Sequence, residues 1–127
     1  MIKKTITYVD YEGVERTEDF HFHLNKAEII KINMTTPGGM VAKLNQITKA
    51  KDTAQLYEVF EDLVHKSFGV KTPDGRGFTK DADTLKAFTE TEAYSKLIVE
   101  LVTDADKAAK FFNGIIPNDE KQLAAKN

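Results

Sequence analysis

Residues 15–24, which read ERTEDFHFHL, carry the pattern that decides the fold. In this stretch Phe20, Phe22 and Leu24 alternate with polar residues. Successive side chains of a β-strand point to opposite faces, so these three apolar side chains share one face. The preceding stretch 2–9, IKKTITYV, is rich in β-branched residues, and Asp10-Tyr11-Glu12-Gly13 lies between the two as a turn. The sequence therefore predicts an N-terminal β-hairpin with one apolar face.

A hairpin of two strands is marginal in water unless its apolar face packs on something else. The residues that follow supply the partners, because their apolar positions recur at helical spacing. Expected helix starts are Asn25 with Glu28, Thr36-Pro37, Asp52 with Gln55, Asp81, Thr91, and Thr103 with Asp106. Expected helix stops are Gly69 and Gly114.

The apolar stripes of these helices give the expected core. The strongest stripe is in the third helix, and the first helix is expected to use Ala27, Ile30 and Met34. The other expected stripe residues are Met40, Leu44 and Ile47; Leu56, Val59, Phe60, Leu63 and Val64; Leu85 and Phe88; Tyr94, Leu97, Ile98, Leu101 and Val102; and Ala105, Ala108, Ala109, Phe111 and Phe112. Residues 70–80 are expected to form a loop or a small hairpin, because they contain Pro-Asp-Gly and a second glycine.

The predicted fold class is α+β, with an N-terminal β-hairpin packed on a bundle of five or six short helices. Residues 1–117 are expected to form a single domain, since a chain of 127 residues has the length of one domain. Residues 118–127 are polar and are expected to be a flexible tail or linker.

Composition excludes several classes of function. The chain has no cysteine, so disulfides, thiolate metal sites and cysteine nucleophiles are excluded. Its formal charge of −2 comes from interleaved acidic and basic residues. Such a distribution forms no continuous basic surface for a nucleic-acid backbone. No apolar run reaches the length of a membrane span, and residues 1–13 do not resemble a signal peptide. We expect a protein of the cytoplasm that binds neither nucleic acid nor a membrane.

A metal site is the first chemical possibility to weigh. His21 and His23 share a strand face with Asp19, so the two histidines could coordinate a metal ion. Tight zinc sites need three or four ligands, and His65 lies far away in the sequence. A solvated polar face explains the pattern better. No nucleophile motif is present either, so we expect no metal, no cofactor and no catalysis.

The stretch 110–117, KFFNGIIP, concentrates large apolar residues around a predicted helix stop. It either closes the core or forms an apolar edge that a second protein covers. We expect part of it to stay accessible, with Phe111, Phe112, Ile115 and Ile116 as the candidate partner-binding residues.

Several segments, taken in order, resemble the small tail assembly chaperones of long-tailed bacteriophages. They are YVDYEGVERTEDFHFHLNKAEI, FGVKTPDGRGFTKD and TEAYSKLIVELVTDADKAAKFFNGIIP, and they span about Thr5 to Pro117. The best markers are Asp10-Tyr11-x-Gly13, Thr17–Phe20, Asp74–Arg76, Thr91–Tyr94 and Asn113–Pro117. Lys71-Thr72-Pro73 departs from the pattern, in a loop that is expected to vary.

The resemblance implies a non-enzymatic assembly factor. Such a protein would bind the tape measure protein, and possibly the tail tube protein, in the host cytoplasm, and would be absent from the mature virion. The resemblance also implies a homo-oligomer and a longer form of the chain made by a −1 ribosomal frameshift. Ala125-Lys126-Asn127 is a permitted translation of a slippery heptamer, which would make residues 118–127 a linker to the extension. Two alternatives are a structural tail or neck protein that stays in the virion, and a metal-dependent hydrolase that uses His21 and His23.

Overall fold

The fold combines a four-stranded antiparallel sheet with six helices, as seen in a computed structural model that describes residues 1–117. The strands are β1 (Ile2–Val9), β2 (Glu15–Phe22), β3 (Phe68–Lys71) and β4 (Phe78–Thr79), in that order across the sheet. The helices are α1 (Lys26–Thr35), α2 (Met40–Ala50), α3 (Thr53–Ser67), α4 (Ala82–Thr89), α5 (Glu92–Thr103) and α6 (Ala105–Ile115). The predicted α+β fold with an N-terminal hairpin is confirmed. The predicted tail 118–127 lies outside the described residues.

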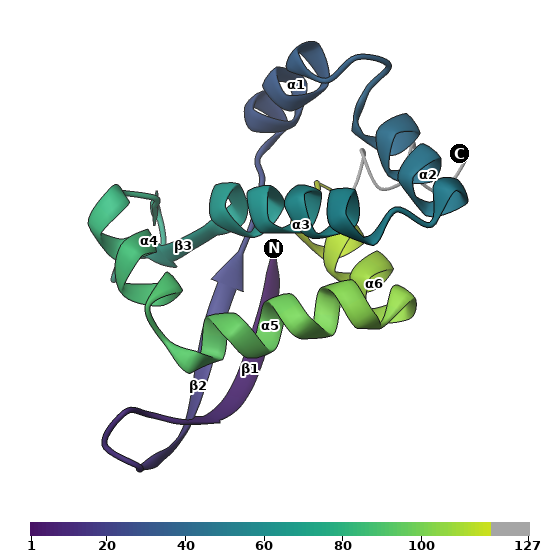
Figure 1. The fold of residues 1–127 in the computed structure, drawn as a ribbon. Helices are drawn as coiled ribbons and strands as arrows, with labels where there is room; N and C mark the ends of the chain where they lie inside the picture. Colours follow the sequence, from purple (N-terminus) through teal and green to yellow (C-terminus); the bar gives the residue numbers. More distant parts are fainter. Residues whose placement is uncertain (118–127) are drawn as a thin grey trace.

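The β1–β2 hairpin is the longest part of the sheet, and its turn projects away from the helices (Figure 1). Ile2 pairs with Phe22 at the base, and Val9 pairs with Glu15 next to the turn. The β3–β4 hairpin, which the sequence allowed between residues 70 and 80, joins this sheet through the pairing of Phe22 with Phe68. Helix α5 packs on β1, α3 and α6, while α1 and α2 lie at the opposite end from the turn (Figure 1).

An aspartate organises each hairpin turn. The Asp10 carboxylate accepts hydrogen bonds from the amides of Glu12 and Val14 and from Arg16 Nε, at 2.9, 3.0 and 2.6 Å. The hydrogen bond from Arg16 and those from the turn amides lower the pKa of Asp10. Asp74 accepts from the Thr72 hydroxyl and from the Arg76 amide, which lowers its pKa in the same way. The turn at residues 10–13 and the turn at residues 74–76 are therefore both held by hydrogen bonds to an aspartate.

The apolar face of the hairpin lies at the centre of the core, as predicted. Phe22 is fully buried and its ring lies 5.7, 5.8 and 5.3 Å from the rings of Phe68, Phe88 and Phe111. Phe20, nearer the turn, is half-buried against Phe88. One strand residue thus contacts side chains from β3, α4 and α6, which fixes the hairpin on the helices.

The backbone after β2 continues this attachment. The His23 amide donates to the carbonyl of Ser67 at the end of α3, and the Leu24 amide donates to the carbonyl of Ile115 at the end of α6. Leu24 itself is buried. Two helix ends that would otherwise hold unpaired carbonyls are thereby satisfied by the strand.

Most predicted N-caps are confirmed. Asn25 and Glu28 form a reciprocal capping box, and Asp52, Asp81 and Thr91 each accept from the backbone three residues on. The cap of α6 is Asp104 rather than the predicted Thr103, whose hydroxyl instead donates to the Val99 carbonyl inside α5.

The start predicted at Thr36-Pro37 is wrong, because α2 begins at Met40. Gly38 and Gly39 have φ of 77° and 88°, a left-handed backbone that cannot belong to a right-handed helix. The Asn33 side chain then accepts from the Met40 amide at 3.0 Å and caps the new start.

The helix stop predicted at Gly69 is confirmed, because α3 ends at Ser67 with Phe68 as its C-cap and Gly69 directly after it. The stop predicted at Gly114 is wrong, because α6 continues to Ile115. Each glycine is a place of close approach, where the absent side chain makes room. A Cβ on Gly69, which lies in β3, would be 2.6 Å from the Phe78 ring, and a Cβ on Gly114, inside α6, would be 2.7 Å from Ile2 Cδ1. Helix α6 therefore continues to Ile115 and lies directly on β1.

The stripe predicted for α1 is on the wrong side of that helix. Ile29 and Ile32 are buried, whereas Ile30 and Met34 are 49% and 80% exposed and Ala27 is exposed. Apolar residues occur on two faces of α1, so spacing alone could not choose which of the two is buried.

His21 and His23 lie on the other face of β2 from Phe22, and burial lowers the pKa of both below the ordinary 6.5. Nearby positive charges lower the two pKa values further. Lys71 and Lys3 act on His21, and the N-terminal amine and Lys80 act on His23. Asp19 and Glu28 oppose this shift. Within the described residues, His23 Nδ1 is buried without a hydrogen-bond partner. The folded protein therefore favours the neutral imidazoles.

We predict that stability falls as the pH drops through about 6.5. The unfolded chain binds more protons in this range, since its histidines keep the ordinary pKa, and linkage then lowers the free energy of unfolding. The carboxylates with lowered pKa, such as Asp10, lose their contribution only near pH 4 and below. Thermal melts between about pH 5 and pH 7.5 at constant ionic strength measure the slope. The double variant His21→Gln/His23→Gln should flatten it, and an unchanged slope would contradict the assignment.

We predict that Phe22→Ala lowers the free energy of unfolding by about 3–5 kcal/mol, because it leaves a cavity between three phenylalanine rings. Phe20→Ala should cost less, since Phe20 is only half-buried. Val99→Ala is the control, because Val99 is 55% exposed. Urea unfolding of the three variants gives the comparison, and equal losses at positions 22 and 20 would place the core elsewhere.

Candidate partner-binding trough

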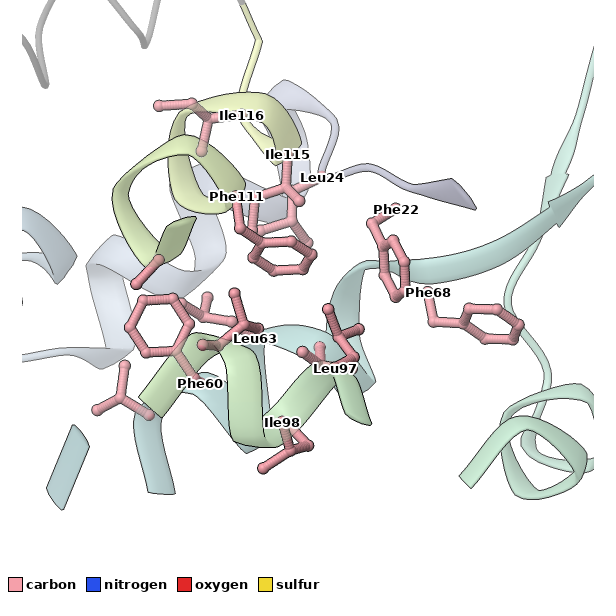
Figure 2. Packing of buried hydrophobic residues seen from close by; sticks show 14 of the residues in the cluster. Phe22, Leu24, Phe60, Leu63, Phe68, Leu97, Ile98, Phe111, Ile115 and Ile116 are labelled. Carbon is pink, nitrogen blue, oxygen red and sulfur yellow. The ribbon is translucent and has the colours of Figure 1, made fainter. Parts of the chain in front are cut away.

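Helix α6 places the four candidate partner-binding residues in different surroundings. Phe111, Ile115 and Ile116 are 1%, 0% and 3% exposed, and Figure 2 shows Phe111 and Ile115 gathered with Leu24 in the core. Phe112 is half-buried and packs at the edge of the cluster. Adjacent helical residues differ by about 100°, so positions 111 and 115 share the core face while 112 points aside. Of the four, only Phe112 retains substantial exposure.

A hollow of about 430 Å³ lies between α1, α2 and α6. Ile29 and Ile32 of α1 line one side, and Met40 and Val41 of α2 line another. Phe112 lies on its α6 side. Helix α2 begins only after Gly38 and Gly39, and this link separates α2 from α1. The hollow lies in the space between the two helices.

A second hollow of about 460 Å³ lies between α2, α3 and α6. Leu44, Ile47, Leu56 and Phe60 line it, and α6 contributes small residues at positions 105, 108 and 109. These three positions are alanine, so α6 leaves space beside α2. The predicted apolar face of α6 therefore consists partly of small side chains that line this hollow.

The two hollows meet, because Val41, Asn45 and Phe112 line both. We call the combined depression the α2 trough. Its walls are mostly aliphatic and its central aromatic residue is Phe112. Of the four predicted partner-binding residues, Phe112 and Ile116 line the trough. Leu44 was expected only as a core residue, and Val41 was not singled out at all.

Among the described residues that line the α2 trough, the charged ones are Lys51 and Asp52, one of each sign. Helix α2 and its C-cap carry Lys43, Lys49 and Lys51 and no acidic residue. Within residues 1–117 these three exposed lysines form no ion pair. The outer face of α1, with Ile30 and Met34, is exposed apolar surface that does not line the first hollow.

This arrangement suits the binding of an apolar segment of another protein. Ligand clefts are mostly apolar with a few polar groups that fix orientation, and Asn33 and Asn45 provide such groups here. Over the described part of the chain, no three His, Asp or Glu residues lie close enough together to hold a metal ion. His65 instead lies 2.7 Å from the Tyr94 hydroxyl, and burial of Tyr94 raises its pKa to about 12.

None of the described helices is long and apolar enough to span a membrane. No curated protein and no solved structure matches this chain. The family model described as phage tail assembly chaperone matches residues 1–127, which is the whole chain. A chaperone role in phage tail assembly agrees with an apolar trough and calls for no catalysis. The chain belongs to the phage tail assembly chaperone family.

Proposed function

We propose that this protein binds the phage tape measure protein during tail assembly, keeps it from aggregating, and leaves before the virion is complete. The observation that carries the proposal is the α2 trough, an apolar depression on a chain of the tail assembly chaperone family. A tape measure protein is long, helical and apolar. Its exposed helices need a transient cover until the tail tube surrounds them.

Helix-in-groove binding fits the dimensions and chemistry of the α2 trough. An amphipathic helix can place one or two apolar side chains in each hollow and lie against Val41 and Phe112 between them. Met40, which lines the first hollow, has a flexible side chain that adapts to different apolar partners. A surface of this kind binds reversibly, as a chaperone that must be displaced requires.

The same proposal covers the remaining partners. Assembly takes place in the host cytoplasm, where the tail tube protein polymerises and would displace the chaperone. A longer form of this chain, made by a −1 frameshift at Ala125-Lys126-Asn127, would carry a second binding region after residues 118–127. These residues lie outside the described part of the chain.

A structural tail or neck protein is the alternative, since it would also be small and non-enzymatic. It differs in its fate: a structural protein stays in the virion. Mass spectrometry of purified phage separates the two, because abundant copies in finished particles would contradict the chaperone proposal.

We predict that Val41→Asp combined with Phe112→Ala lowers affinity for tape measure segments at least about tenfold, since a buried charge and a lost aromatic anchor both fall in the trough. The measurement is the soluble fraction of a co-expressed tape measure fragment, followed by titration of the purified proteins. Val99→Asp is the matched control, because it places the same charge on an exposed position of α5. Equal binding by both variants would exclude the α2 trough as the binding site.

The gene sequence tests the frameshift. We expect codons GCA-AAA-AAY for residues 125–127, followed by an open −1 frame beyond the stop codon. Any other codons at these positions would exclude a slip there and leave the trough proposal intact.

A further inference from the structure

Helix α1 forms one wall of the first hollow, yet its own apolar residues orient it only weakly. A helix with a single apolar stripe is oriented by the burial of that stripe. Helix α1 instead has an inner face with Ile29 and Ile32, which are buried, and an outer face with Ile30 and Met34, which are exposed. A rotation of α1 about its axis would exchange one apolar pair for the other. Directed polar contacts are therefore needed to keep the inner face inward.

Lys80 supplies such contacts at the start of α1. Its ammonium group donates hydrogen bonds to the carbonyl of His23 at 2.7 Å and to both carboxylate oxygens of Glu28 at 2.8 Å. These acceptors lie 57 and 52 residues away along the chain. The side chains of Lys80 and Glu28 are 21% and 35% exposed, so the ion pair is partly withdrawn from water. We call these three hydrogen bonds the Lys80 latch.

The β3–β4 hairpin holds the Lys80 side in a fixed position. Lys80 lies between strand β4 and Asp81, which is the N-cap of α4. Its ammonium group is 5.7 Å from the centroid of the Phe78 ring, within the range of a cation–π contact. The Phe78 ring in turn lies against Gly69 of β3, where a Cβ would come within 2.6 Å of it. A donor that is already positioned loses little conformational entropy when it forms its hydrogen bonds.

The remaining attachments of α1 leave its rotation to the Lys80 latch. Figure 1 shows α1 at the edge of the molecule, joined to β2 and α2 by short links. Before α1, the amide of Leu24 is bonded to the Ile115 carbonyl, which keeps the start of the helix near the core. After α1, the Asn33 side chain accepts from the Met40 amide at 3.0 Å, a contact between neighbouring parts of the chain. The Lys80 latch ties α1 to a distant part of the fold.

We propose that the Lys80 latch holds Ile29 and Ile32 in place as a wall of the α2 trough and thereby sets the affinity of the trough for its partner. Lys80 lines neither hollow, so it is a positioning residue that acts through α1. A wall that is already in place binds a helix without first being ordered, so loss of the latch lowers affinity. This effect on affinity rests on the proposed function, whereas the orientation of α1 does not.

Thiol labelling of the full chain tests the latch without any partner. The chain has no cysteine, so Ile29→Cys introduces a single thiol, on the inner face of α1. We expect the thiol reagent DTNB to modify it at least about fivefold faster when Lys80→Met is added, because hydrogen bonds to charged groups are among the stronger ones. An unchanged rate would overturn the proposal.

Two controls separate the latch from a general loss of stability. Lys86→Met removes the same charge from an exposed ion pair within α4, and it should leave the labelling rate of Ile29→Cys unchanged. The reporter Val64→Cys places its thiol at a buried position of α3, and its slow labelling should not respond to Lys80→Met. Labelling that Lys80→Met accelerates equally at positions 29 and 64 would mean global destabilisation and would overturn the proposal.

Glu28→Gln tests whether the ion pair itself is the latch. Glutamine can replace glutamate in a capping box, so this variant keeps the cap of α1 and removes the charge that Lys80 binds. Glu28→Gln should also accelerate the labelling of Ile29→Cys. Its addition to Lys80→Met should accelerate labelling no further, because the two changes break one interaction. Accelerations that multiply in the combined variant would overturn the proposal.

Titration with a tape measure fragment separates this inference from the proposed function. We expect Lys80→Met to lower the affinity for the fragment at least about fivefold, and Lys86→Met to leave it unchanged. Faster labelling without any loss of affinity would overturn the link between latch and affinity, and would place the tape measure site away from the first hollow. An unchanged labelling rate in a protein that still binds the fragment would overturn the latch and leave the proposed function standing.

Discussion

The fold depends on the burial of Phe22 among Phe68, Phe88 and Phe111. These rings come from β2, β3, α4 and α6, elements spread over most of the chain. A two-stranded hairpin gains stability only when its apolar face is covered, and each helix is too short to persist alone. The packing of Phe22 meets both needs, because it covers the apolar face of the hairpin and holds α4 and α6 against the sheet. The backbone bonds of His23 and Leu24 to the ends of α3 and α6 then fix the direction in which the chain leaves the sheet.

The α2 trough follows from how α6 meets the rest of the molecule. Gly114 lets α6 lie directly on β1, and this position turns Phe111 and Ile115 into the core. Phe112 is left at the boundary, beside a row of alanines that cannot fill the space next to α2. Close packing on one side of the helix is therefore linked to open space on the other. A chaperone that binds apolar helices needs such a surface, yet it must keep that surface small enough to stay dispersed.

Charge is distributed unevenly along the chain, although the formal total is only −2. The hairpin carries an excess of acids, and α1 and α2 carry an excess of lysines. Net charge alone hides this polarity, which becomes meaningful once the fold places the two regions at opposite ends (Figure 1).

Local signals in the sequence predicted most of the secondary structure and the centre of the core, although they misplaced the start of α2 and the end of α6. Alternation at 20, 22 and 24 predicted the buried hairpin face, the caps at Asn25, Asp52, Asp81 and Thr91 marked helix starts, and the order of short motifs indicated the family. Of the residues that line the candidate site, sequence analysis had identified Phe112 and Ile116 as partner-binding residues.

Tertiary packing settled the features that local signals leave open. Helix α1 carries apolar residues on two faces, so only packing could choose Ile29 and Ile32 over Ile30 and Met34. Gly114 was expected to end a helix because glycine permits a left-handed backbone, but it lies inside α6 and makes room for Ile2, which is distant in the sequence. The trough joins residues from four helices, and a depression exists only where their side chains fail to fill the space between them, which no single segment encodes.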